Sequence, residues 1–176
     1  MTGNEINLEQ MLARREARAR EQELLRKKYH GTLISFTMNI PGPVKTNELI
    51  RKAFETGKSL LLGRMEGIHA EINHSSEIHE DTGDELLLSV KNIPPEKLKD
   101  LAVSIETASP VGRLYDIDVI DADGKKLSRK TFRKCLICDK QAQECARSRS
   151  HTVKEMQEAV INLLEQKTPP EMFKRG

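Results

Sequence analysis

The sequence is organised around one short stretch, Gly112-Arg113-Leu114-Tyr115-Asp116-Ile117-Asp118-Val119, which predicts a strand that carries two acids. Side chains on a strand alternate between its two faces. Asp116 and Asp118 therefore point to the same side, and the apolar residues that flank them point to the other. Two carboxylates are thus expected to share one small space on the face of a sheet.

Carboxylates in such a place need a partner, because Leu114 and Ile120 share their face and make full solvation of that face unexpected. Neighbouring half-buried acids either share a proton or hold a cation, and their oxygens suit a hard ion such as Mg²⁺. An edge strand with both acids solvated is the alternative. The metal interpretation predicts phosphoryl or nucleotidyl transfer, with Asp116 and Asp118 as the metal ligands.

Composition limits the classes of function that fit. The chain has 176 residues, enough for one domain with a real core. Its 29 basic and 27 acidic residues leave a net charge of +2, and only 3% of residues are aromatic, which argues against a nucleic-acid binder. The N-terminus lacks a signal-peptide pattern and no apolar run reaches bilayer length, so we expect a cytoplasmic protein that binds no membrane.

Hydrophobic periodicity around the acidic stretch predicts alternating helices and strands. The predicted helices cover 8–28, 48–65, 94–107 and 153–166, and the predicted strands cover 32–40, 70–78, 85–90, 114–120 and 127–132, the last after a turn at 123–124. This order indicates a single α/β (α+β) domain with a mixed, mainly antiparallel sheet flanked by helices. We divide it into a charged N-terminal helix (1–30), a core (31–134), a Cys/Arg/His segment (135–152) and a C-terminal helix with a tail (153–176).

Several basic residues are candidates for binding phosphate. Lys45 precedes the helix predicted from residue 48, where free backbone N–H groups and the helix dipole favour an anion. Gly112 would let the backbone approach phosphates, and the planar guanidinium of Arg113 can contact two phosphate oxygens at once. A solvated lysine and a surface arginine are the alternatives.

The segment before the last helix contains two overlapping patterns. Cys135, Cys138, Cys145 and His151 could supply three sulfurs and one imidazole to a structural zinc ion, although three idle thiols fit as well. Arg147, Arg149 and His151 also cluster just before a helix that opens with a Thr152–Glu155 capping box, where they could hold a phosphate group or form a basic surface loop. His151 cannot easily serve both roles.

The first predicted helix is rich in arginine. Its residues Arg14, Arg15, Arg18 and Arg20 are interleaved with glutamates, which is typical of a solvated helix face. The alternative is a surface that binds an acidic partner.

Taken together, these motifs resemble the apo-citrate lyase phosphoribosyl-dephospho-CoA transferase family, also called citrate lyase holo-acyl carrier protein synthases. The resemblance spans nearly the whole chain and rests on four runs: Leu12-Ala-Arg-Arg-Glu-Ala-Arg-Ala-Arg20, Ser35-Phe36 through Pro41-Gly42-Pro43-Val44-Lys45, Gly112 to Val119, and Cys135 to His151. One departure is Ser109 before Pro110, where a histidine is expected in this family.

The resemblance implies a nucleotidyltransferase-like active site with Mg²⁺, and catalytic roles for Asp116, Asp118 and Arg113. The implied donor is 2′-(5″-triphosphoribosyl)-3′-dephospho-CoA, and the acceptor is a serine of the acyl carrier subunit of citrate lyase. Pyrophosphate leaves and a phosphodiester forms. Gly112, Lys45, Arg147, Arg149 and His151 would then contact substrate. The competing hypothesis is a non-catalytic accessory protein that docks a carrier or lyase subunit through its arginine-rich first helix.

Overall fold

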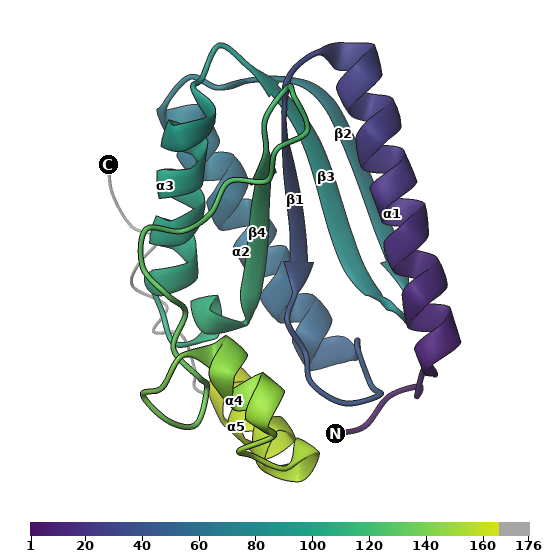
Figure 1. Cartoon of the computed structure of the whole chain (residues 1–176). Helices are drawn as coiled ribbons and strands as arrows, with labels where there is room; N and C mark the ends of the chain where they lie inside the picture. The colour runs from purple at the N-terminus through teal and green to yellow at the C-terminus, as the bar shows by residue number, and fades with distance from the viewer. Residues whose placement is uncertain (166–176) are drawn as a thin grey trace.

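A four-stranded antiparallel sheet lies at the centre of the computed structural model, which describes residues 1–165 (Figure 1). Its strands, in the order β2-β3-β1-β4, are β1 (Thr32–Met38), β2 (Glu71–Glu80), β3 (Gly83–Lys91) and β4 (Tyr115–Ile120). The core sequence of elements is β-α-β-β-α-β, the ferredoxin-like arrangement of split βαβ units. The α/β class with a mainly antiparallel sheet is confirmed, and a likeness to nucleotidyltransferases stays a prediction.

The helices cover the two faces of this sheet unequally (Figure 1). The sequence of helices is α1 (Leu8–Tyr29), α2 (Glu48–Gly67), α3 (Pro95–Thr107), the 3-10 helix η1 (Val111–Leu114), α4 (Ala142–Ser148) and α5 (Val153–Glu165). Side chains of α2 and α3 form the main core with one face of the sheet, whereas α1 packs on the other face over β1 and β3. The acidic face of β4 is therefore left open beside α1.

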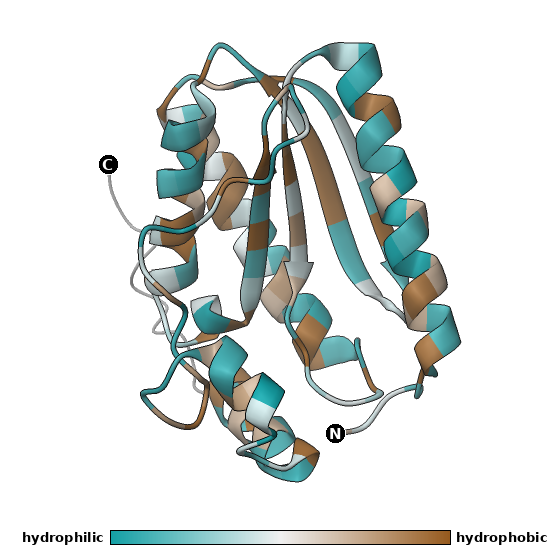
Figure 2. Cartoon of the chain, in the orientation of Figure 1, coloured by the Kyte–Doolittle hydropathy of each residue, from teal (hydrophilic) through white to brown (hydrophobic). Residues whose placement is uncertain are grey.

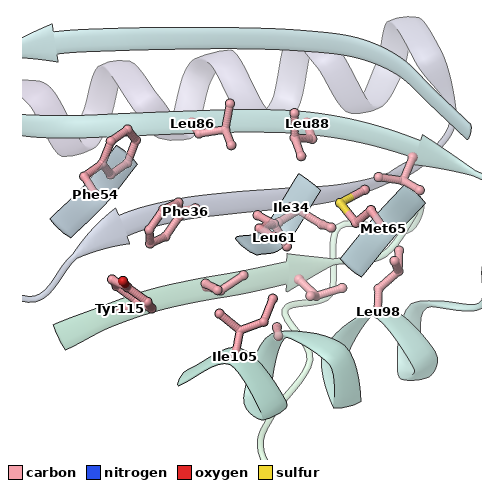
Figure 3. Packing of buried hydrophobic residues seen from close by; sticks show 14 residues of the cluster. Ile34, Phe36, Phe54, Leu61, Met65, Leu86, Leu88, Leu98, Ile105 and Tyr115 are labelled. Atoms are coloured by element: carbon pink, nitrogen blue, oxygen red, sulfur yellow. The ribbon is translucent and has the colours of Figure 1, made fainter. Parts of the chain in front are cut away.

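The main core follows from the alternation of apolar side chains along the strands (Figure 3). Figure 2 shows the same alternation as hydrophobic bands on the central strands. Phe36 of β1 stacks on Phe54 of α2 at 4.8 Å between ring centroids and meets the edge of Tyr115 from β4. Burial raises the pKa of Tyr115 to about 12, and its hydroxyl donates to the carbonyl of Ala53. The residues flanking the two acids are thus fixed in the core.

The ends of the helices are set by local signals in the sequence. Asn47 caps α2 because its side chain accepts from the N–H of Ile50 at 2.9 Å. His30 ends α1 in the left-handed conformation just before Gly31. Thr152 and Glu155 form the predicted capping box at the start of α5. The predicted helix residue Gln166 and the C-terminal tail lie outside the described residues.

Two predictions about the segment after β4 were wrong. The strand predicted at 127–132 is absent, and within the described part the returning chain pairs with β4 as a strand only at a single bridge between Ile120 and Lys126. Its basic side chains instead form ion pairs, with Arg129 on Glu106 and Lys130 on Asp100, which hold the segment as a loop. The short helix α4 was not predicted.

The arginine-rich helix α1 is anchored to the sheet by charge. Arg14 and Arg18 both bind the carboxylate of Glu85 on β3, at 2.6 and 2.7 Å, and their side chains are only 11% and 23% exposed. The interpretation as a solvated face was therefore wrong for these two residues. No helix within residues 1–165 combines the length and apolar character needed to cross a membrane.

Candidate functional site

Asp116 and Asp118 lie on the same face of β4, as the alternation predicts. Their neighbours Tyr115, Ile117 and Val119 are buried in the main core, so the acids point to the opposite face of the sheet. The Asp116 side chain is 46% exposed and that of Asp118 is 25% exposed. Both acids are therefore accessible to a ligand from the open half of that face.

Two hollows meet at Asp116. The larger is a groove of about 860 Å³ between β4, α3, α4 and the loop after β4, and both acids line it. The smaller, of about 120 Å³, lies between β4, α1 and the β1–α2 loop. Asp116 and Asn39 line both spaces. Asp116 thus stands at the junction of a long groove and a compact hollow, and Asp118 lines the groove alone.

Two cations from the loop after β4 accompany the acids. Arg133 lies 3.7 Å from Asp116, and Lys126 lies 2.5 Å from Asp118. The Lys126 side chain is 61% exposed, so its pairing with Asp118 is worth little and can be exchanged for another cation. Asp116 is the less firmly held of the two acids.

Backbone hydrogen-bonding groups on the outer edge of β4 pair with side chains of α3 instead of with another strand. Glu106 of α3, whose side chain is 3% exposed, accepts from the N–H of Ile117 at 2.8 Å and pairs with Arg129 and Arg133 at 2.8 and 2.9 Å. Lys99 donates to the carbonyl of Ile117, and burial lowers its pKa below the ordinary lysine value. Sequence reasoning missed this arrangement, which fixes β4 and connects it to Arg133.

Arg113 and Gly112 belong to η1, which precedes β4, and neither is among the described residues that line the two spaces. The guanidinium of Arg113 donates to the carbonyl of Cys135, and its own carbonyl accepts from Arg133 at 3.5 Å. Gly112 is buried, and a Cβ there would lie 2.7 Å from the carbonyl oxygen of Ile105. The observed contacts of both residues are thus structural, and their predicted contacts with phosphate stay predictions.

Replacing Gly112 with alanine should destabilise the fold by about 1–3 kcal/mol, because the added methyl group meets backbone that cannot turn away. Urea unfolding followed by circular dichroism measures this. Gly63→Ala on α2 is the control, since nothing lies within 4 Å of a Cβ there and alanine favours a helix. Equal midpoints for Gly112→Ala and wild type would contradict the packing role.

Lys45 reaches the small hollow from the β1–α2 loop. Its ammonium donates to the carbonyl of Ile40 at 2.7 Å and is half-buried. Burial, followed by the nearby charge of Arg15, lowers the pKa of Lys45 below the ordinary lysine value. The predicted substrate lysine therefore does face the side of the site that contains Asp116.

The predicted metal ligands come together as a compact group. One ligand atom each of Cys135, Cys138, Cys145 and His151 lies within 4.8 Å of the others. The sulfur of Cys138 is 3.5 Å from that of Cys145 and 3.4 Å from Nε2 of His151. Tetrahedral bonds of about 2.3 Å to a zinc ion place ligand atoms roughly 3.5–3.8 Å apart. The spacing of the group fits a metal ion of that size.

The backbone around the group supports the same interpretation. The amides of Cys138 and Ile137 donate to the Cys135 sulfur; burial raises the pKa of this thiol, but these donors outweigh it and the net pKa is lowered. Burial and the neighbouring sulfurs raise the pKa of Cys145 to about 11. His151 lies next to the cysteines, with its Nε2 3.4 Å from the sulfur of Cys138. Arg147 and Arg149 are instead exposed around the C-terminal end of α4 and are not among the described residues that line the groove.

Comparison with known proteins connects this site to a family. A sequence model described as apo-citrate lyase phosphoribosyl-dephospho-CoA transferase matches residues 6–167, which include the acid pair and the cysteine group. The chain belongs to this family. The predicted resemblance and the predicted class of enzyme are thereby confirmed.

Individual relatives agree with this assignment across most of their length. A protein of Streptococcus pyogenes serotype M18 (strain MGAS8232), named a probable apo-citrate lyase phosphoribosyl-dephospho-CoA transferase, is 38% identical over 173 residues, covering 93% of this chain and 88% of the relative. A Vibrio cholerae serotype O1 (strain M66-2) protein of the same name is 34% identical, with 93% and 92% covered. The apo-citrate lyase phosphoribosyl-dephospho-CoA transferase of Citrobacter koseri is 31% identical, with 88% and 86% covered.

Ser109, which departs from the expected histidine, has a local structural role. Its hydroxyl accepts from the N–H of Gly112 at 3.1 Å and so closes the turn into η1. Neither space includes it among the described lining residues. A proton-transfer role at this position is not needed to explain the side chain that is present.

Proposed function

We propose that this enzyme transfers the phosphoribosyl-dephospho-CoA group from 2′-(5″-triphosphoribosyl)-3′-dephospho-CoA to a serine of the citrate lyase acyl carrier subunit and releases pyrophosphate. Family membership supports the donor and the carrier as substrates. The observation that carries the reaction type is the acid pair on one face of β4: Asp116 and Asp118 both line the groove, and Asp116 also lines the small hollow, with basic residues in both linings.

The acid pair fits Mg²⁺ on the chemistry of its donors. Asp116 and Asp118 present carboxylate oxygens on the same face, and oxygens are the ligands that Mg²⁺ prefers. Their ion-pair partners are the exposed Lys126, on Asp118, and Arg133, at 3.7 Å from Asp116. We therefore assign both acids as the residues that hold the ion. When bound, Mg²⁺ supplies neutralisation of charge on the triphosphate.

The remaining groups of the groove would bind and orient the donor. Arg133 stands beside Asp116, and Lys126, Arg129 and Lys130 line the groove with it, so the phosphates of the donor would meet positive charge along its length. The side chain of Phe132, 59% exposed at the same groove, offers an apolar surface for the nucleoside part. The carrier serine would approach Asp116 from the open side of the groove.

We also propose that the cysteine group holds a structural zinc ion. Three sulfurs and one imidazole form a closed set of four ligands, which is typical of structural sites and leaves no position for substrate. The segment contacts η1, which leads into β4, because the carbonyl of Cys135 accepts from Arg113, and the helix carrying Cys145 forms a wall of the groove. Zinc would therefore stabilise the groove without taking part in the reaction.

Purified wild-type protein should contain about one zinc ion per chain, and His151→Asn should lose most of it, since three ligands do not close the site. Plasma emission spectrometry measures the metal after gel filtration. The control is His69→Asn, which makes the same exchange at an exposed histidine outside the group. Zinc-free wild type from zinc-supplemented cells would contradict the proposal, as would full zinc content in His151→Asn.

A coupled assay for pyrophosphate tests the transfer reaction itself. Incubation of the enzyme with the donor, Mg²⁺ and the carrier subunit should release one pyrophosphate per carrier modified. A carrier whose acceptor serine is replaced with alanine should release none. Release that does not depend on the carrier serine would show hydrolysis of the donor and would contradict the proposed acceptor.

A further inference from the structure

Three cations line the small hollow beside Asp116, and two of them are not paired with the acid that holds Arg18. Arg15 of α1 and Lys45 of the β1–α2 loop both line it, and the charge of Arg15 contributes to the lowered pKa of Lys45. Neither residue forms an ion pair within residues 1–165. Two positive charges held near each other, one of them on the half-buried amine of Lys45, repel each other unless an anion binds between them.

The acids in the lining of the hollow do not supply that anion. Asp84 is fully buried and already binds Thr46, Arg51 and His79, at 3.0, 3.1 and 2.7 Å. The Glu85 side chain is 8% exposed, and both its oxygens are taken by arginines of α1. Asp116, the remaining acid of the lining, has a half-exposed side chain that pairs with Arg133 at 3.7 Å and forms no ion pair with Arg15 or Lys45 within the described residues.

The register of the sheet places these groups on one line. Thr37 of β1 stands opposite Glu85 of β3 on one side and opposite Asp116 of β4 on the other. Neighbouring strands are about 4.8 Å apart, so Glu85 and Asp116 stand roughly 10 Å from each other across Thr37. The α1 arginines that reach Glu85 therefore stand next to the space in front of Asp116, with Arg15 on the same helix.

The size of the hollow also limits its ligand. Its volume of about 120 Å³ equals the share of liquid volume of roughly four water molecules. That space suits one or two phosphoryl groups and is too small for a nucleotide. The groove of about 860 Å³ on the other side of Asp116 is large enough for a nucleotide. The two spaces are thus suited to different parts of one phosphorylated donor.

We propose that the small hollow is the subsite for the leaving pyrophosphate, which Arg15 and Lys45 bind while the rest of the donor occupies the groove. This inference rests on the proposed transferase function and adds the direction in which the donor lies. It gives Arg15, a residue outside the predicted site, a substrate-binding role. It also explains why Asp116, at the junction, is the acid shared by both spaces.

The bond changes follow from this direction. The serine oxygen forms a bond to the phosphorus attached to the ribose oxygen, and the bond from that phosphorus to the next bridging oxygen breaks. The electron pair goes to the bridging oxygen, which leaves as part of pyrophosphate toward Arg15 and Lys45. The serine proton is released to the solvent side of the groove, so no oxidant or further reactant is required.

The test uses inorganic pyrophosphate as the probe, with titration calorimetry on the full chain at about 0.15 M salt, where distant charges are screened. Arg15→Ala should weaken pyrophosphate binding about tenfold or more, because a charge-assisted contact is lost. Arg15→Lys should restore part of the affinity. Since Arg15 is exposed on α1, these variants should keep the fold, and circular dichroism checks it.

Arg20→Ala is the matched control, as an exposed arginine of the same helix that does not line the hollow. Its pyrophosphate affinity should equal that of wild type. Unchanged binding in Arg15→Ala, or equal weakening in Arg20→Ala, would overturn the subsite even if the wild type modifies the carrier. Binding that depends on Arg15 in a protein that modifies no carrier would uphold the subsite and refute the transferase proposal.

Discussion

Replacing Asp116 with asparagine should lower the rate of carrier modification by about a thousandfold, and Asp118→Asn should have a similar effect. Each exchange keeps the shape of the side chain and removes one negatively charged ligand of Mg²⁺, whose stabilisation of the transition state is worth several kcal/mol. The fold should persist because both side chains are partly exposed and point away from the main core. Initial rates at saturating donor measure the effect.

The control for this pair is Asp123→Asn. Asp123 is an exposed acid in the turn that follows β4, and its exchange removes the same charge a few residues from the site. It should leave the rate within about twofold of wild type, as expected for a solvated charge. Wild-type rates in both Asp116→Asn and Asp118→Asn would refute the assignment of the metal ligands.

Replacing Glu106 with alanine should destabilise the protein by about 3–5 kcal/mol, the usual cost of removing one partner of a buried ion pair. The change leaves Arg129 and Arg133 without their shared acid and the N–H of Ile117 without an acceptor. Glu106→Gln should cost less, because its amide oxygen can still accept from Ile117. Chemical unfolding in urea gives both free energies of unfolding.

Activity should fall together with stability in the Glu106 variants, because Glu106 also positions Arg133 beside Asp116. The matched control is Glu96→Ala, an exposed acid in the first turn of the same helix, which should cost less than about 1 kcal/mol. A Glu106→Ala variant as stable as Glu96→Ala would show that the buried network contributes nothing.

Most of the fold was predictable because its signals are local. Alternating apolar residues predicted β1 and β4, and the helix predicted from residue 48 begins where α2 begins, next to its cap Asn47. The strand predicted at 127–132 failed for a long-range reason, since its register with β4 is replaced by ion pairs to α3. The partner of a lysine or arginine depends on which elements become neighbours, and spacing along the chain does not contain that information.

The same distinction applies to the site. The alternation of side chains along the strand predicted that Asp116 and Asp118 share one face. The spacing of the three cysteines predicted the group that they form with His151. The role of Arg15 depends on the order β2-β3-β1-β4, which puts α1 next to the open face of β4. Glu106 was missed because nothing in a helix sequence indicates that one acid is buried against the edge of a later strand.

The central claim is that the acid pair serves the covalent transfer of a phosphoribosyl-dephospho-CoA group. Intact mass spectrometry of the carrier subunit tests it most directly, after incubation with this enzyme, the donor and Mg²⁺. We predict a gain equal to the mass of the donor minus pyrophosphate, present with wild type and absent with Asp116→Asn or without Mg²⁺. An unchanged carrier mass with active donor and wild-type enzyme, or the same gain with Asp116→Asn, would contradict the account.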